Sequence, residues 1–266
     1  MNMSESTDND NGQSAEMSLS KELAEFCKSD SISVAGLREI IERHGLNNLP
    51  QRDYEFFLAA CRNERVNEGI IQCLLEYFPA AISATDEKGQ SPLHLAFRYN
   101  KNVTLNIIQL LIDAAPAIVR SVNSDGMMPL HYLCRYSSAN EEAVELEILK
   151  LLIEKYPEAV RHADNKGNLP IHLVFGFRSP EFCRVLVEAY PGSERINDVN
   201  RGMLPLHLAC LENNVATVEC LYTMYPDAVN HAATNGLYPI HFAIFSMEDR
   251  DDPKPAVDIV EYLLDC

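Results

Sequence analysis

The chain has 266 residues, of which 47% are hydrophobic and 23% are charged, and its formal net charge at pH 7 is −17. This composition is enough for a sizeable core, and no segment approaches the run of roughly 18 apolar residues that a membrane span requires. Because phosphate binding depends on an excess of Lys and Arg, the acidic charge argues against nucleic acid as the principal partner.

The first residues and the cysteines favour a reducing compartment. Residues 1–20 are rich in Ser, Asp, Glu and Asn, and they have neither the basic end nor the apolar centre of a secretory signal peptide. The eight cysteines form no Cys-x-x-Cys pair, so reduced thiols that fill small core positions are favoured over a disulfide framework. We therefore expect a cytoplasmic or nuclear protein.

The N-terminal part of the chain divides into a tail and a helix pair. Residues 1–19 are too polar to bury a core, and we predict a disordered acidic tail there. Residues 21–27 and 34–44 have apolar side chains at helical spacing. The pattern predicts that residues 20–46 form an irregular helix pair, which caps the N-terminal end of the structure that follows.

One motif then recurs five times. A Gly is followed three positions later by Pro, then by Leu or Ile, then by His, as in Gly-Gln-Ser-Pro-Leu-His-Leu-Ala at residues 89–96. Successive motif prolines are 37, 41, 35 and 34 positions apart, which is the period of a stacked-repeat protein. The motif residues are Gly89, Pro92, His94, Gly126, Pro129, His131, Gly167, Pro170, His172, Gly202, Pro205, His207, Gly236, Pro239 and His241.

Each motif position has a mechanical reason. The Gly suits a turn position with positive φ, and the Pro suits the first position of a helix, where its missing N–H removes no hydrogen bond. A second Pro lies 13 or 14 residues before each motif Pro, after an apolar helical run, and is predicted to close that helix. Each unit should therefore be a turn, a short helix, a loop, a longer helix and a stop.

The unit resembles the ankyrin repeat, whose signature is Asp-x-x-Gly-x-Thr-Pro-Leu-His-x-Ala. Residues 86–96 match this signature with Ser91 in the Thr place. The other copies have an apolar residue before the Pro and carry Tyr-Pro near the end of the second helix, a variant that is similar to repeats abundant in some unicellular algae. The resemblance implies an all-α, ankyrin-type helical solenoid with short turn connections over residues 47–266.

Six repeats are expected, with the first and two later ones departing from the plan. In the first, Glu55-Phe56-Phe57 stands where the others have Pro-Leu-His, as suits a terminal repeat with no neighbour on one side. Insertions between helices are expected around residues 137–142 and 246–255, the second as an exposed acidic loop. The approximate repeat boundaries are 48–85, 86–122, 123–163, 164–198, 199–232 and 233–266.

The motif histidines invite a catalytic or metal-binding interpretation. However, they recur at one position of successive repeats, which are spaced by about 10 Å, the distance between packed helices, whereas metal ligands lie about 2 Å from a single ion. We therefore interpret them as structural residues that hydrogen-bond the turns of neighbouring units.

Other candidates for chemistry are weaker still. Two His-x-x-Cys pairs, at residues 131–134 and 207–210, supply only two of the four ligands of a structural zinc site, so their cysteines are interpreted as small core residues. Neither a phosphate-binding Gly-rich loop nor a Gly-x-Ser-x-Gly nucleophile elbow is present. The sequence therefore predicts no catalytic, metal or cofactor-binding residue.

The resemblance also implies where a partner would bind. In ankyrin-like stacks the concave face is lined by the hairpin tips and by the exposed ends of the first helices, and Arg and Tyr often anchor interfaces. The alternative is that these side chains only pack against the next helix. The predicted protein-binding residues are Arg98, Tyr99, Met127, Arg135, Tyr136, Phe177, Met203, Leu237 and Phe245.

The sequence as a whole predicts a non-enzymatic protein–protein interaction module, an adaptor or scaffold, whose partner is another protein. The alternatives are an enzyme or metal protein on the same stack, and a structural spacer with no specific partner on the concave face. The last helix, expected at about 256–264, presents apolar residues on more than one side. Self-association, continuation of the chain and self-capping by its acidic residues are left as alternatives there.

Overall fold

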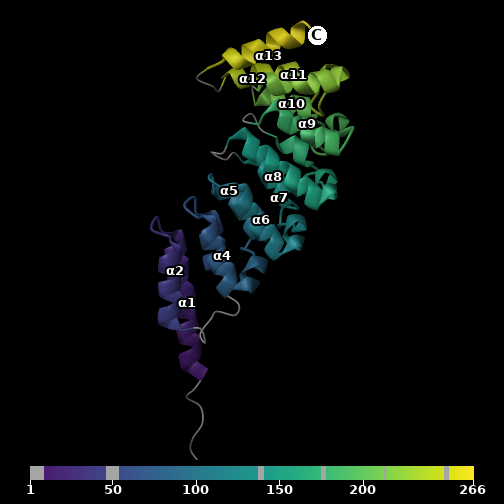
Figure 1. Cartoon of the computed structure of the whole chain (residues 1–266). Helices are drawn as coiled ribbons and strands as arrows, with labels where there is room; N and C mark the ends of the chain where they lie inside the picture. Colours follow the sequence, from purple (N-terminus) through teal and green to yellow (C-terminus); the bar gives the residue numbers. More distant parts are fainter. Residues whose placement is uncertain (1–8, 46–53, 137–140, 175–177, 213, 249–251) are drawn as a thin grey trace, which may run out of the picture. The chain divides into compact units, whose positions relative to one another are not determined.

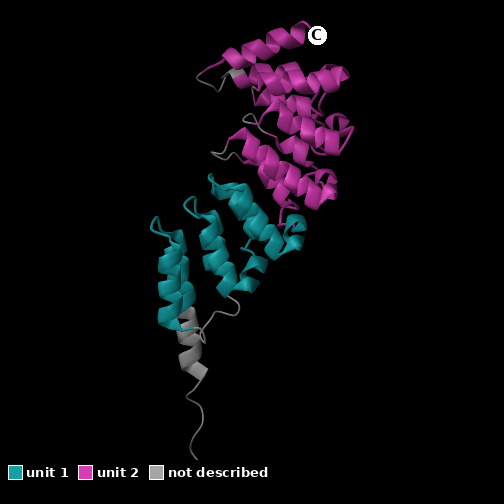
Figure 2. Cartoon of the chain, in the orientation of Figure 1, with its two compact units in different colours: residues 1–121, 138–140 teal, residues 122–137, 141–266 magenta. Residues whose placement is uncertain are grey.

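The computed structural model describes residues 9–45, 54–136, 141–174, 178–212, 214–248 and 252–266, with the side chains of 9–18 and 247–248 excepted. Every regular element in these ranges is an α-helix or a 3-10 helix (Figure 1), which confirms the all-α prediction. No helix within them is long and apolar enough to cross a bilayer. The chain forms two compact units, residues 1–121 with 138–140 and residues 122–137 with 141–266, called unit 1 and unit 2 (Figure 2).

Unit 1 is a stack of helix pairs in two layers. In one layer α1 packs against α3 and α3 against α5, and in the other α2 packs against α4 and α4 against α6. The N-terminal helix pair therefore continues the two layers of the repeats. The elements are α1 (Asn9–Lys28), α2 (Val34–His44), α3 (Glu55–Arg62), α4 (Glu68–Tyr77), η2 (Pro79–Ser83), α5 (Pro92–Tyr99), α6 (Leu105–Ala114) and η3 (Pro116–Arg120).

The first helix begins earlier than the sequence predicted. Order was expected from Ser20, but α1 starts at Asn9, and residues 1–8 lie outside the described ranges. Leu19, assigned to the disordered tail, is completely buried together with Leu23 and Cys27. These three residues recur every four positions, so they form one apolar stripe on α1. The assignment of Leu19 to the tail was wrong because this stripe starts one turn earlier than assumed.

Unit 2 repeats the same two-layer plan. One layer runs from α7 through η5 and α10 to α12, and the other from α8 through α9 and α11 to α13. The apolar core lies between the layers and ends with Ala243 and Ile259 of the last helix pair. The elements are α7 (Pro129–Arg135), α8 (Glu142–Lys155), η4 (Pro157–Arg161), η5 (Pro170–Leu173), α9 (Pro180–Ala189), η6 (Ser193–Arg195), α10 (Pro205–Leu211), α11 (Val215–Met224), η7 (Pro226–Asn230), α12 (Pro239–Glu248) and α13 (Lys254–Leu264).

Prolines set the helix boundaries in two ways. The motif prolines begin the first helix of each unit, as predicted. The second set of prolines was predicted only to stop a helix. In fact α6 ends at Ala114, and Pro116 then opens the 3-10 helix η3, because a fixed φ suits the first turn of a helix as well as it blocks an interior position. In the same way, a Pro begins a 3-10 helix just after α4, α8 and α11.

The repeat at 164–198 departs from the predicted short helix. After Pro170 the chain forms only the four-residue 3-10 helix η5, which ends at Leu173. Gly176 follows within a few positions, and Gly is a poor residue for a helix interior. Arg178 comes next and is almost completely buried, with 1% of its surface exposed.

Candidate protein-binding surface

The hairpin tips are built from an Asx turn and a glycine. Asp86 Oδ1 accepts hydrogen bonds from the backbone N–H groups of Lys88 at 3.0 Å and Gln90 at 2.9 Å, and Asn123 bonds its own tip in the same way. The prediction of positive φ at the motif glycines is confirmed in all five copies. The φ values are 69° at Gly89, 76° at Gly126, 77° at Gly167, 64° at Gly202 and 80° at Gly236.

Neighbouring tips in unit 2 are joined through the backbone. The N–H of Asn165 donates to the carbonyl of Asp125 at 3.0 Å, and that of Thr234 donates to the carbonyl of Arg201 at 2.8 Å. Asn200 Nδ2 adds a bond to the carbonyl of Lys166 at 2.7 Å. These hydrogen bonds place the tips in a row at one edge of the unit.

Each motif histidine bonds to its own turn, whereas the sequence predicted bonds to the turns of neighbouring units. In all five copies Nδ1 accepts a hydrogen bond from the backbone N–H of the residue before the Pro, at 2.9–3.1 Å. With Nδ1 as the acceptor, the proton of the neutral ring lies on Nε2. His131 Nε2 can therefore donate to the carbonyl of Asn168 at 3.3 Å, and His172 Nε2 to that of Ile196 at 2.8 Å. Each of these bonds reaches the tip region of the following repeat.

The buried rings are held in the neutral form. Burial, with a second contribution from neighbouring His162, lowers the pKa of His131 to about 4. Burial together with His231 lowers the pKa of His207 to about 4 in the same way, and burial also lowers the pKa of His172. Neutral rings that are fixed between two turns suit a structural role.

Burial of the thiol in both His-x-x-Cys pairs opposes the binding of a metal ion. Both ring nitrogens of His131 are engaged in hydrogen bonds, and complete burial raises the pKa of the Cys134 thiol, which opposes the thiolate that zinc requires. Burial likewise raises the pKa of Cys210. In the part of the chain that the structure describes, no three His, Cys, Asp or Glu residues are grouped so as to hold an ion.

Two of the predicted binding positions carry the same arrangement. At the end of α5 the guanidinium carbon of Arg98 lies 5.0 Å from the ring centre of Tyr99, and at the end of α7 that of Arg135 lies 5.8 Å from the ring centre of Tyr136. Tyr99 and Arg135 are exposed, and their partners are partly exposed. The first pair belongs to unit 1 and the second to unit 2.

The other predicted contacts divide into three groups. Phe245 at the C-terminal half of α12 is exposed and Leu237 is partly exposed, whereas Phe177 lies outside the described residues. Met127 and Met203 are 4% and 2% exposed, so the expectation that they face a partner was wrong.

The burial of these methionines has a simple cause. The residue after the motif Gly closes the hairpin by pairing its backbone with the Asx residue, as Met127 O does with Asn123 N at 3.1 Å. Its side chain is thereby directed into the stack. Gln90 and Asn168 occupy the equivalent position and are buried too. Two methionines at a repeated position were a sign of core packing.

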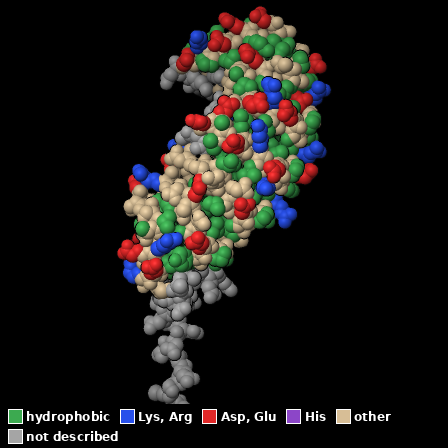
Figure 3. All heavy atoms as spheres, viewed as in Figure 1, with side chains coloured by type: hydrophobic (Ala, Val, Ile, Leu, Met, Phe, Trp, Pro, Cys, Tyr) green, Lys and Arg blue, Asp and Glu red, His purple; other side chains and the backbone are tan. Residues whose placement is uncertain are grey.

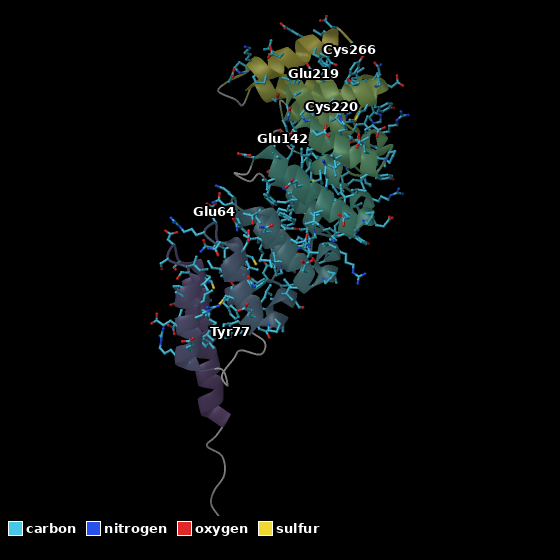
Figure 4. All side chains as sticks on the ribbon, in the orientation of Figure 1. Glu64, Tyr77, Glu142, Glu219, Cys220 and Cys266 are labelled. Atoms are coloured by element: carbon cyan, nitrogen blue, oxygen red, sulfur yellow. The ribbon has the colours of Figure 1, made fainter. Side chains whose placement is uncertain are left out.

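Sequence reasoning missed two surface depressions. One, of about 550 Å³, lies in unit 1 at the end of α3, near Glu64 in Figure 4, and its arginines are paired: Arg62 with Asp86 at 3.2 Å and Arg65 with Asp30 at 2.8 Å. The other, of about 580 Å³, lies in unit 2 between α9 and α11, beside Glu219 and Cys220. Mutual pairing of the charges in the first leaves it with little preference for an anion or a cation.

Comparison with known proteins agrees with the geometry. The family model for ankyrin repeats in three copies matches residues 56–155 and 141–230, which together are more than half of the chain. No curated protein matches the sequence. Among solved structures, the ankyrin repeat domain of Bcl-3, described as a unique member of the IkappaB family, is similar with a TM-score of 0.54 and 19% identity, over 79% of this chain and 84% of that one.

The structural match shows a shared fold, and the family model shows ancestry over the greater part of the sequence. Both agree with the tips, the prolines and the histidines described above. The chain therefore belongs to the ankyrin-repeat family.

Proposed function

We propose that the chain is a non-enzymatic module that binds another protein, as an adaptor or scaffold, through the exposed ends of its first helices. Ankyrin repeats generally mediate protein–protein interaction, and this family assignment supports the general part of the proposal. The proposal names neither nucleic acid nor a membrane as a principal partner, and the net charge of −17 supports the first of these two choices.

The observation that carries the proposal is the repeated Arg–Tyr stack. An exposed or partly exposed Tyr with an Arg beside it occurs at the end of α5 and again at the end of α7. Stacking the guanidinium on a ring reduces the freedom of both side chains before binding, so less conformational entropy is lost when a partner is bound. Tyr99 is exposed at its helix end, and Tyr136 is partly exposed with its ring 5.3 Å from that of the buried Tyr132, so both rings keep surface that an interface can use.

The setting of the cysteines supports a reducing compartment. All eight cysteines are free, and six of them are buried in the stack. We propose on this ground that the protein acts in the cytoplasm or the nucleus. A spacer with no specific partner remains the competing function, and the following experiment separates the two.

The test compares partner capture by three forms of the full chain in extracts of the native cell. Tyr99→Ala combined with Tyr136→Ala should weaken capture by about 1 to 4 kcal/mol, that is roughly five- to several-hundred-fold, because buried aromatic anchors contribute this much to interfaces. Tyr77→Ala is the matched control, since Tyr77 is partly exposed on the second helix α4 (Figure 4). Capture that is equal for the double variant and the control, with both forms folded by circular dichroism, would exclude these helix ends.

A further inference from the structure

The last repeat of unit 2 carries a concentration of exposed apolar side chains. Eight large hydrophobic residues are exposed in the described part of the chain, and five of them fall between residues 238 and 264. These five are Tyr238, Ile244, Phe245, Val257 and Leu264. Of these, Leu264 is 71% exposed, far above what packing within the unit would leave.

Comparison with earlier repeats shows that this exposure is specific to the repeat at 233–266. Ile244 lies three positions after the motif His and is 45% exposed, whereas Cys134 and Cys210 at the same position are completely buried. Tyr238 precedes the motif Pro and is 40% exposed, whereas Leu204 at that position is 1% exposed. In earlier repeats these positions are closed by the following helix pair, as α12 closes on α10.

The exposed residues form stripes on both helices of the last pair. On α13, the exposed Val257 and Leu264 lie seven positions apart on one side of the helix, and the partly buried Val260 lies between them and the core. Ala256 and Ile259, on the adjacent side of the helix, are completely buried. We call the surface formed by Tyr238, Ile240, Ile244, Val257, Val260 and Leu264 the end face.

The charged residues around the end face indicate which kind of partner it can bind. Asp252, Asp258, Glu261 and Asp265 are all exposed, and Lys254 is the one exposed cation among the described residues of 252–266. Figure 3 shows apolar atoms and acidic side chains together at this end of unit 2. A second copy docked on this face would bring two sets of four carboxylates together, whereas a partner with Lys or Arg beside its apolar residues would neutralise them.

We propose that the end face binds an amphipathic helix of another protein, whose apolar side is bordered by Lys and Arg residues. The apolar stripes provide the contact area, and the carboxylates select a basic partner and orient it. This surface is separate from the Arg–Tyr helix ends, so the proposal stands or fails independently of the function proposed above.

The probe is a synthetic amphipathic helix of about 18 residues, with Leu on one face at spacings of three and four and Lys on the other. A matched peptide carries Glu in place of every Lys. Binding to the full chain is measured by fluorescence anisotropy at about 0.15 M salt, so that distant charges are screened. The Lys peptide should bind at least about tenfold more tightly than the Glu peptide, because only it complements the carboxylates.

Variants of the chain locate the binding. Ile244→Lys with Leu264→Lys should weaken binding of the Lys peptide at least about tenfold, and Asp258→Lys with Glu261→Lys should weaken it by a similar factor. Val199→Lys with Glu181→Lys is the control, because it changes one exposed apolar and one exposed acidic residue of unit 2 outside the end face. All the substituted side chains are exposed or project from the surface, so each variant should keep the wild-type melting temperature.

Three outcomes would overturn the proposal. The first is no binding of the Lys peptide, or equal binding by the end-face and control variants. The second is equal affinity for the Lys and Glu peptides, which would remove the argument from charge. The third is a concentration-dependent dimer of the chain alone that Leu264→Lys disperses in sedimentation experiments, since the occupant would then be a second copy. Hydrogen exchange of the wild type provides a check without mutation, because bound peptide should slow exchange in α12 and α13.

Discussion

The repeats at 164–198 and 199–232 begin with almost the same turn and then diverge. Gly-Asn-Leu-Pro-Ile-His-Leu in the first leads only to the 3-10 helix η5, whereas Gly-Met-Leu-Pro-Leu-His-Leu in the second leads to the α-helix α10. Both motif histidines make the same bond to their own turn, at 2.9 and 3.1 Å. The turn is therefore fixed by the motif, but the helix after it is not.

A single buried arginine takes the place of the missing helix. Arg178 forms an ion pair with Glu145 of α8 and donates to the backbone carbonyls of Leu133 and Tyr136 at the end of α7. Its own carbonyl accepts hydrogen bonds from the side chains of Asn214 and Thr217 in the next repeat, at 2.8 and 3.3 Å. One residue thus joins three successive repeats. In the regular repeats this connection is made by packing between first helices.

The comparison implies that Arg178 contributes far more to the stability of the fold than an exposed arginine does. Arg178→Ala should lower the free energy of unfolding by about 3 to 5 kcal/mol, because it leaves a carboxylate that is almost buried without its cation. Arg184→Ala is the control, since Arg184 is half-exposed and pairs with an equally exposed Glu181, and it should cost less than about 0.5 kcal/mol. Urea unfolding of the full chain measures both.

A second pair of substitutions distinguishes loss of the ion pair from loss of packing. If the charge left on Glu145 causes the damage, Arg178→Met with Glu145→Leu should recover a large part of the stability that Arg178→Met alone loses. Values for Arg178→Ala and Arg184→Ala within about 1 kcal/mol of each other would show that the irregular repeat is held by other contacts.

Acid should act more strongly on the regular repeats. The pKa of His131 and of His207 is about 4 in the folded chain, against about 6.5 for an unperturbed His. The unfolded state therefore takes up protons first as the pH falls below about 6.5, and stability should be lost between about pH 6.5 and pH 4. Between pH 7.5 and pH 5 each of these histidines should account for a loss of about 2 kcal/mol.

The irregular repeat offers the control. His131 lies 5.8 Å from the ring of His162, whereas His172 bonds to Ile196, which stands at the corresponding place before the next tip. His131→Asn should therefore reduce the pH dependence of stability more than His172→Asn does. The measurement is urea unfolding at pH 7.5 and pH 5. An equal pH dependence of the free energy of unfolding in the two variants would mean that the neighbouring His162 contributes nothing.

A smaller loss of stability is expected from substitutions at the hairpin tips. The tip of the irregular repeat is bonded to the tip of the repeat before it. A Cβ at Gly126 would lie 2.7 Å from the backbone nitrogen of Asn165, whereas a Cβ at Gly236 would meet nothing within 4 Å, although both glycines have φ near 80°. Gly236→Ala should therefore cost about 1 kcal/mol for the backbone conformation alone. Gly126→Ala should cost about 2 kcal/mol or more, since the tips must also separate. Thermal unfolding that shifts equally for the two would show that contact between the tips adds nothing.

The sequence predicted the features that the motif repeats. The positive φ at Gly89 and the Pro at the start of α5 depend on residues within a few positions of one another, so local chemistry was sufficient. A match over five copies then made the family recognisable. Features that depend on nearby residues and recur in several copies can be predicted from the sequence.

The remaining features depend on contacts between distant residues. The burial of Arg178 requires a carboxylate on α8 and two carbonyls on α7, none of which is near it in the sequence. The inward direction of Met127 became clear only from the backbone pairing of its tip. Leu19 belongs to the core because α3 covers it, which composition alone does not indicate. For the candidate binding surface, Arg98, Tyr99, Arg135, Tyr136 and Phe245 are exposed or partly exposed as expected, whereas the tip residues Met127 and Met203 are buried.

The bonds that join the hairpin tips have a consequence for how such a protein changes over evolution. They all end on backbone carbonyls, as from Asn165 N to Asp125 O, and the motif histidines bond to backbone groups as well. The position four residues after the motif His takes no part in them, and it is occupied by Arg98, Arg135, Leu211 and Phe245 in different repeats. Under the function proposed above, a mutation at that position would alter which partner is recognised and would leave these hydrogen bonds in place. Recognition and stability would then be inherited through separate sets of residues.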